Sequence, residues 1–319
     1  MTTSVLGLIV RAMLVCAPQP PAEPSPSTTP AQAPTEQTVT NPPQEFPPIV
    51  VKSPPKPAPG AGFANADELL VSLEDADKGM TSLTAQIVYN KILATVGDKQ
   101  TRSGRLYFQN AGVQGRRFAI EFDTFVRGDG AVDNDPRLYV FDGQWLLDKN
   151  TREKRFTKKQ VVPPGQNFDP LKIGEGPFPI PIGQKREDIL SRYNAELLPV
   201  SDGLDPKDPA QKRLIEFVEK GRSVQLRLVP RPDRPDQDRF KEIRLWYAPE
   251  KDGGRLLPKM ARTIAVGTEP GENGDESIVR LVDVKLNGAI PPGVLDTSTP
   301  PAAEGWDGVV TDFREPAGK

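Results

Sequence analysis

Apolar and polar residues alternate from the second quarter of the chain onward, the pattern of β-strands that bury one face. In the first such segment, Leu83, Ala85 and Ile87 share one face. Turn residues separate the segments, and Asp142-Gly143 is a strong signal for a hairpin turn. The pattern predicts about eleven strands. They cover residues 83–90, 101–109, 117–126, 137–141, 144–148, 154–162, 214–219, 223–229, 241–247, 259–266 and 277–286.

The segment before the first strand has the spacing of an amphipathic helix. Asn65 and Glu68 form a capping-box pair, and apolar residues then recur every three or four positions. We therefore predict a helix over 66–78 and a second helix over 187–197. Residues 163–183 are rich in Pro and Gly, which favours a long irregular crossing between strands.

A short apolar run opens the chain. Residues 1–17 are too short to span a membrane and have the length of an export signal. Leu14-Val15-Cys16 resembles the end of a bacterial lipoprotein signal, in which Cys16 would carry a lipid anchor. Ordinary cleavage near Ala17 and an unprocessed, buried Cys16 are the alternatives. We expect an exported protein of the periplasm or cell envelope.

The 36 Pro residues of the 319-residue chain are unevenly distributed. Residues 18–63 are rich in Pro, Ser, Thr and Gln and too poor in large apolar groups to fold, which predicts a disordered tether. One domain over 64–299 then remains, followed by a tail over 300–319 that we expect to cover an open sheet edge.

The composition argues against most catalytic chemistry. The chain has no His and one Cys, which excludes His-based triads, His proton shuttles and the usual zinc hydrolase sites. Glu121 and Asp123 face outward by alternation, where their pKa values would not be tuned for catalysis. We expect neither an enzyme nor a cofactor or metal. The acidic residues Glu269, Glu272, Asp275 and Glu276 are interpreted as a solvated turn.

The order of several local motifs resembles the LolA/LolB-like family of outer-membrane lipoprotein carriers. The matching pieces are 82–85, 103–108, 117–120, 141–146, 226–230 and 282–287. The resemblance implies an α+β, mainly β fold: a strongly curved antiparallel sheet, forming an unclosed half-barrel of about eleven strands under two or three helices. It also implies a non-catalytic protein that binds a lipid or lipoprotein acyl chain in an apolar cavity. We expect a monomer.

Alternation assigns seven residues to the inner face of the half-barrel. We expect the acyl chain to contact Leu106, Phe108, Phe118, Ile120, Phe122, Trp145 and Leu147, with ordinary core packing as the alternative for each. The family carries an Arg-Pro pair after the second strand, and the Arg closes the empty cavity. This chain departs from that pattern with Gln109-Asn110-Ala111, so the closing residue is absent or displaced to Arg116 or Arg117.

A basic stretch follows the Asp142-Gly143 hairpin. It contains Arg152, Lys154, Arg155, Lys158 and Lys159, which could contact lipid head groups or an acidic partner, or could protect a sheet edge. The net charge of −2 gives no general attraction to nucleic acid. The alternative function is a protein-interaction domain that uses the same curved sheet without a lipid.

Overall fold

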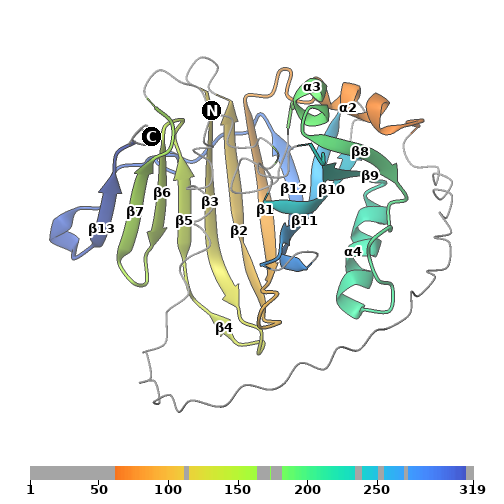
Figure 1. The fold of residues 1–319 in the computed structure, drawn as a ribbon. Coiled ribbons are helices and arrows are strands. Elements are labelled where there is room, and N and C mark those ends of the chain that lie inside the picture. The colour runs from red at the N-terminus through yellow and green to blue at the C-terminus, as the bar shows by residue number, and fades with distance from the viewer. Residues whose placement is uncertain are drawn as a thin grey trace, which may run out of the picture.

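The structure is a computed structural model, and it describes residues 62–110, 115–163, 173, 182–233, 239–250, 255–268 and 272–313. The predicted export signal with Cys16, nearly all of the predicted tether and Glu269 lie outside these ranges. Most of the described chain forms a single curved sheet that does not close on itself (Figure 1).

The sheet has 13 strands in the order β13-β7-β6-β5-β3-β2-β1-β12-β11-β10-β9-β8, with β4 paired to β3 beside this path. Neighbouring strands are antiparallel except for β13 and β7, which are parallel. The predicted mainly β half-barrel is therefore confirmed. The strands are β1 (Ser82–Ile92), β2 (Lys99–Asn110), β3 (Arg116–Val126), β4 (Val132–Asp133), β5 (Arg137–Phe141), β6 (Trp145–Asn150), β7 (Arg155–Gln160), β8 (Tyr193–Leu198), β9 (Val224–Pro230), β10 (Phe240–Pro249), β11 (Leu256–Val266), β12 (Asn273–Leu286) and β13 (Asp307–Thr311).

Three α-helices and one short 3-10 helix accompany the sheet in the described ranges: α2 (Ala66–Glu74), α3 (Arg186–Leu190), α4 (Pro209–Lys220) and η3 (Ala302–Glu304). None of them is both long enough and apolar enough to cross a membrane.

Two sequence predictions were wrong in this region. The predicted helix 187–197 divides into the short α3 and the edge strand β8, and the predicted strand 214–219 lies inside α4. Asp208 caps α4 with a 2.8 Å hydrogen bond from the Ala210 amide, and Pro209 stands in its first turn. The capping residues lie outside residues 214–219. These six residues alone therefore favoured the spacing of a strand over that of a helix.

The residues of the sheet divide between two faces, because directly paired residues of neighbouring strands point the same way. We define the α2 face by the residues that pack with α2 or share its side of the sheet. It carries two apolar clusters, one under α2 and α3 on β8 to β11 and one on β12, β1, β2, β3, β5 and β6. Val279 pairs with Ala261 on one side and Tyr89 on the other, so the two clusters are continuous.

The opposite side is the α4 face. Leu214 and Val218 of α4 pack there on Trp246 and Met260. A second cluster on this face joins Val294 of the C-terminal segment to residues of four strands. The strand members are Tyr107, Ala119, Val140 and Leu147. The segment after β12 thus crosses the α4 face before it reaches β7.

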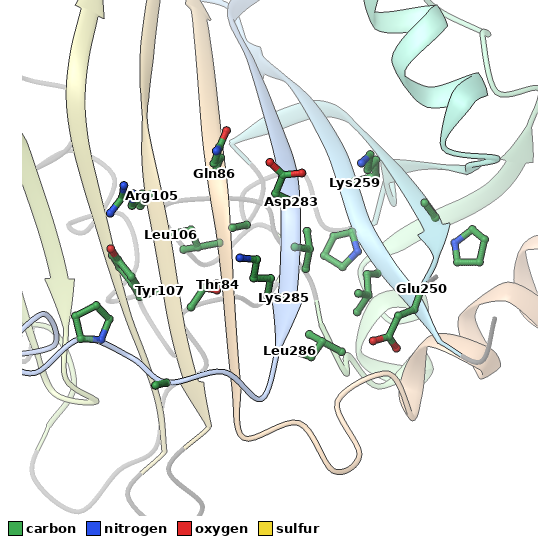
Figure 2. Close-up of a pocket in the computed structure, with 18 residues that line it drawn as sticks. Thr84, Gln86, Arg105, Leu106, Tyr107, Glu250, Lys259, Asp283, Lys285 and Leu286 are labelled. Carbon is green, nitrogen blue, oxygen red and sulfur yellow. The ribbon is translucent and has the colours of Figure 1, made fainter. Parts of the chain in front are cut away.

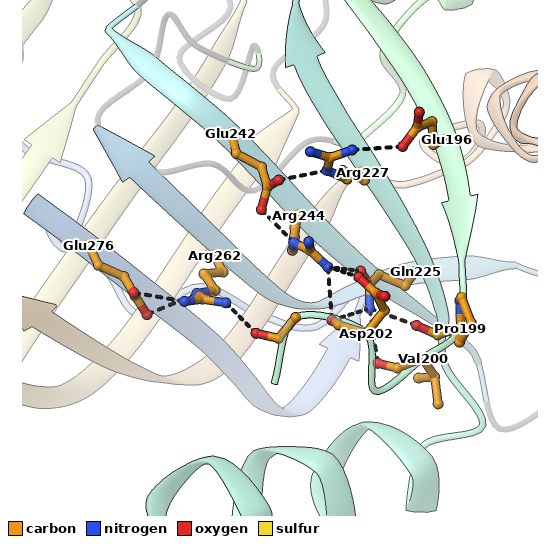
Figure 3. A network of polar contacts seen from close by, with 11 residues as sticks. Glu196, Pro199, Val200, Asp202, Gln225, Arg227, Glu242, Arg244, Arg262 and Glu276 are labelled. Atoms are coloured by element: carbon orange, nitrogen blue, oxygen red, sulfur yellow. Dashed lines mark hydrogen bonds and ion pairs between the residues drawn. The ribbon is translucent and has the colours of Figure 1, made fainter. Parts of the chain in front are cut away.

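A polar network fixes the connection between β8 and α4 (Figure 3). The buried amide of Gln225 donates hydrogen bonds to the carbonyl oxygens of Pro199, Val200 and Asp202, at 2.9 to 3.1 Å. Arg244 donates to the carbonyl and carboxylate of Asp202, at 2.9 and 2.6 Å, and also pairs with Glu242. These partners satisfy buried polar groups, so we interpret the network as structural.

The start of α2 gives the first test. Asn65 Oδ1 caps the helix by accepting a 3.0 Å hydrogen bond from the Glu68 amide, and Glu68 Oε2 accepts a 2.8 Å bond from the amide of Ala64, one residue before the cap. We predict that Asn65→Ala lowers the free energy of unfolding by about 1 kcal/mol. The measurement is urea unfolding, with Val71→Ala at an exposed site of the same helix as the control. Equal stability of Asn65→Ala and the wild type would contradict the cap.

Candidate functional site

The larger apolar cluster of the α2 face is rich in aromatic residues. Phe118 stacks on Phe141 with ring centroids 5.8 Å apart, and Phe122 meets Tyr139 edge to face at 6.2 Å. The strand residues of the cluster are almost completely buried, and they form one apolar wall across six strands. They include Leu83, Ala85, Ile87, Leu106, Phe108, Phe118, Ile120, Phe122, Tyr139, Phe141, Leu146, Val279 and Leu281.

The cover over this wall differs from the cover over the rest of the α2 face. Among the described residues, the buried members outside the strands are Met80, Val161, Val162 and Ile182, and none of them belongs to a helix. Helices α2 and α3 pack instead on the neighbouring cluster over β8 to β11. Among the described residues, the cover of the aromatic wall therefore belongs to no helix.

Arg116 links two parts of this cover to the start of β3. Its guanidinium donates a 2.9 Å hydrogen bond to the Ile182 carbonyl and forms a 2.5 Å ion pair with Asp77, just beyond α2. Both side chains are about one-fifth exposed, at 17% and 22%. Arg116 is one of the two residues to which the sequence assigned a displaced closing arginine. Its contacts fit a clasp that holds the cover against the sheet.

The far end of the α2 face is polar. Arg102 forms a 2.7 Å ion pair with Asp135, and Asn150 donates a 3.1 Å hydrogen bond to the same carboxylate. Arg137 lies 3.8 Å from Asp135 and 3.7 Å from Asp148. We call Arg102, Asp135, Arg137 and Asp148 the charged cluster.

Burial changes the protonation of one member of the charged cluster. Asp148 is only 16% exposed. This burial raises the pKa of its carboxyl group to about 6, although Arg137, Arg102 and Lys159 oppose the shift. Burial likewise raises the pKa of the neighbouring Tyr139 hydroxyl. At neutral pH, Asp148 is a carboxylate in a place that favours the neutral acid.

An open groove of about 870 Å³ lies at the α4 face, bordered by the C-terminal segment (Figure 2). Two β-bulges form part of it. Lys259 is the extra residue where β11 meets β10, and Asp283 lies in the bulge of β12 against β1 with a left-handed φ of 52°. Its lining mixes cations, carboxylates and apolar groups. The charged members are Arg105, Glu250, Lys259, Asp283 and Lys285.

The structure places the predicted lining residues on both faces. Leu106, Phe108, Phe118, Ile120 and Phe122 all belong to the aromatic wall. The assignment of Trp145 and Leu147 to the same face was wrong. Leu147 pairs with Val140 and packs in the cluster of the α4 face. Trp145 lies two residues earlier in β6 and therefore on the same face.

The correction in β6 follows from the strand register. Leu146, which pairs with Phe141, is the residue of β6 that reaches the aromatic wall. Trp145, Leu146 and Leu147 are three consecutive large apolar residues, so alternation alone could not decide between the two faces.

The five basic residues do not form one surface. Arg152, Lys154 and Arg155 are exposed at or beside the turn before β7, and Lys154 donates a 2.7 Å hydrogen bond to the Glu304 carbonyl. Lys158 lies 4.9 Å from the centre of the Trp145 ring, on the α4 face, whereas Lys159 pairs with Leu146 on the α2 face. The strand they occupy is not the sheet edge, because β13 pairs with β7.

Sequence reasoning missed the charged cluster. Its signal was present, since Arg137 and Tyr139 continue the face of Phe141 along β5, and Asp148 continues that of Leu146 along β6. Arg137 and Asp148 are the first and last residues of the predicted strands 137–141 and 144–148. Within the described ranges, no group of three or more acidic or Cys side chains is placed to hold a metal ion.

No protein-family profile and no curated protein matches this sequence. Several solved structures are similar in fold. They include a putative outer membrane lipoprotein-sorting protein domain from Vibrio parahaemolyticus, with 14% identity, a TM-score of 0.32, and 72% of this chain and 96% of that chain covered. A LolA superfamily protein from Nitrosomonas europaea has 11% identity and a TM-score of 0.29, with 74% and 99% covered.

A conserved protein of Thermus thermophilus is similar as well, with 12% identity, a TM-score of 0.37, and 76% of this chain and 98% of that chain covered. The similar structures thus include members of the family that the sequence resembles. Because every one of these TM-scores is below 0.5, the fold assignment rests on the strand pairing of this chain, and no function is inferred from the similarity.

The raised pKa of Asp148 predicts a pH dependence of stability. The unfolded carboxyl titrates near 3.9, so between about pH 4 and 6 the folded protein binds more protons than the unfolded chain. Stability contributed by this group is therefore complete below pH 4 and is lost as the pH rises to about 6. In the wild type, the free energy of unfolding should therefore fall by about 2 to 3 kcal/mol over this pH range because of Asp148, and we predict that this fall is absent in Asp148→Asn.

The measurement is the free energy of unfolding of both proteins from pH 4 to 7. A carboxyl titration of Asp148 by NMR serves as the direct control, and a pKa near the unfolded value would contradict the prediction.

The Arg116 clasp gives a second test at this site. Arg116→Met leaves the partly buried Asp77 carboxylate without its guanidinium, so we predict a loss of about 1 to 3 kcal/mol of stability. The Asp77→Asn change in the same background should recover part of this loss in a double-mutant cycle. Arg127→Met, at an exposed ion pair, is the matched control and should leave stability almost unchanged. Additive effects of the Arg116 and Asp77 changes would contradict the clasp.

Proposed function

We propose that this protein is a non-catalytic binding protein of the bacterial cell envelope, which holds the acyl chain of a lipid or lipoprotein against the α2 face of its half-barrel. The observation that supports the proposal is the aromatic wall, an apolar surface across six strands whose described cover contains no helix. In this proposal Leu106, Phe108, Phe118, Ile120 and Phe122 contact the acyl chain.

The energetics favour an exchange between cover and ligand. If an acyl chain replaces apolar contacts such as those of Val161, Val162 and Ile182, the wall stays out of water. The ligand then contributes about 0.8 kcal/mol for each methylene group that it buries. Opening must break the contacts of Arg116 with Asp77 and Ile182, so the clasp sets part of the cost of loading.

The N-terminal region supplies the location in this proposal. Residues 1–17 act as the export signal, with Cys16 as a possible lipid anchor, and residues 18–63 tether the domain to its membrane. In this proposal the exposed Arg152, Lys154 and Arg155 contact acidic head groups or a partner.

A second candidate function is binding of a protein partner, and the groove of the α4 face favours it. The groove is open, and its lining combines charged side chains with apolar ones, as in many peptide-binding surfaces. This function requires no ligand on the aromatic wall. Native mass spectrometry of protein purified from a bacterial envelope separates the two, because acyl species that co-purify support the first candidate and a ligand-free protein that excludes fatty-acid probes supports only the second.

A pair of matched variants tests which face binds the acyl chain. Leu106 and Leu147 are both 2% exposed, on the α2 face and the α4 face respectively. Either one replaced by Asn should cost several kcal/mol of stability, on the order of 2 to 5, because a cavity and a buried amide result. We predict that Leu106→Asn lowers binding of a fluorescent fatty acid at least tenfold, whereas Leu147→Asn leaves it unchanged.

Binding is measured by fluorescence titration under conditions in which circular dichroism shows both variants folded. Equal binding by the two variants would reject the α2 face as the lipid site.

A further inference from the structure

The α2 face changes its chemistry along the strands, and the strand register arranges the change in rows. Phe118, Phe141 and Leu146 are paired across β3, β5 and β6 and form an apolar row. Two residues further along, Ile120, Tyr139 and Asp148 form the next row. Phe122, Arg137 and Asn150 form the third. Because successive residues of one face are about 7 Å apart, the face passes from purely apolar to charged within about 14 Å.

The charged end of the face is built around two arginines. Arg102 of β2 and Arg137 of β5 both lie close to the Asp135 carboxylate, at 2.7 and 3.8 Å. Arg102 also lies 4.2 Å from the centre of the Phe125 ring. The side chains of Arg102 and Arg137 are 18% and 12% exposed, so each is held largely out of water.

The cluster holds more cations than carboxylates. Arg102 and Asp135 are in direct hydrogen-bonding contact, and Arg137 lies 3.7 Å from the carboxylate of Asp148 and 3.8 Å from that of Asp135. Lys159 adds a third positive charge near Asp148. Three cations thus surround two carboxylates, one of which is poorly stabilised as an anion.

A ligand that lies along the strands would meet these features in order. Its acyl chain would cover the apolar row, and its polar end would reach the two arginines. Guanidinium groups bind carboxylate and phosphate oxygens in planar, charge-assisted pairs. We propose that Arg102 and Arg137 bind the anionic head group of the lipid ligand, a carboxylate or a phosphate. This inference rests on the proposed function, because it assigns the polar end of the same ligand.

The experiment compares ligands of equal chain length that differ only in the head group. Palmitate, the 16-carbon alcohol and 1-palmitoyl-glycerol phosphate each displace a neutral fluorescent probe from the full-length protein. We expect the wild type to bind at least one of the two anions about 10- to 100-fold more tightly than the alcohol. The anion with the larger ratio identifies whether the head group is a carboxylate or a phosphate.

Variants test the assignment to these arginines. Arg137→Met and Arg102→Met should each reduce the affinity for the preferred anion toward that for the alcohol, with alcohol binding unchanged. Arg105→Met is the matched control, because Arg105 lies on the same strand as Arg102 but lines the groove of the α4 face, and it should keep the full preference. Asp148→Asn removes a competing carboxylate without removing an arginine, and it should increase the preference for the anion.

The outcomes separate the two proposals. The head-group site would be overturned if the wild type bound the alcohol and the anions equally. It would also be overturned if both arginine variants kept the preference for the anion. Either result would leave acyl binding intact. If the arginine variants do not fold, an unchanged or smaller preference in Asp148→Asn would overturn it. Failure of all three ligands to bind would overturn the proposed function itself, and this inference with it.

Discussion

The pairing of β1 with β12 is the contact on which the rest of the structure depends. Every strand from β2 to β7, together with β13, lies on one side of this pair, and β8 to β11 lie on the other. The paired residues are far apart in sequence, as with Leu83 and Leu286, so their pairing closes a loop of about 200 residues at a large cost in chain entropy. Ile87 and Leu281 pair within the seam and belong to the same apolar cluster, which offsets part of that cost.

Once β1 and β12 are paired, the register determines which residues lie on each face of the sheet. Different segments then cover the two faces. Helix α4 and the segment leading to β13 pack on the α4 face, while α2 and α3 pack on only part of the α2 face. In the part of the chain that the structure describes, apolar side chains outside the helices and the Arg116 clasp cover the aromatic wall. The same wall grades into the charged cluster, so the sheet offers an apolar surface with one polar end. That arrangement is the physical basis for the amphipathic ligand that we propose.

The sequence predicted much of this arrangement, because alternation and turns are local. The alternating strands β2 and β3, the cap of α2 at Asn65 and the face of five of the seven predicted lining residues could be read directly. Three things could not. The six residues inside α4 fitted both the helical and the strand spacing of apolar residues. The three consecutive apolar residues around Leu146 did not show which of them faces the α2 side of the sheet. Strand β13 pairs in parallel with a strand about 150 residues earlier. The charged cluster also depends on non-local pairing, since Arg102 and Asp135 meet only when β2 and the residues before β5 come together.

The central claim, that an acyl chain lies on the α2 face, is tested most directly by paramagnetic relaxation from a stearate that carries a nitroxide near its methyl end. Methyl resonances of Leu106 and Ile120 report on the aromatic wall, and those of Val140 and Leu147 report on the opposite face of the same sheet. We predict strong broadening of the first pair and little change in the second. Broadening confined to Val140 and Leu147, or none at a saturating concentration of the ligand, would contradict the account.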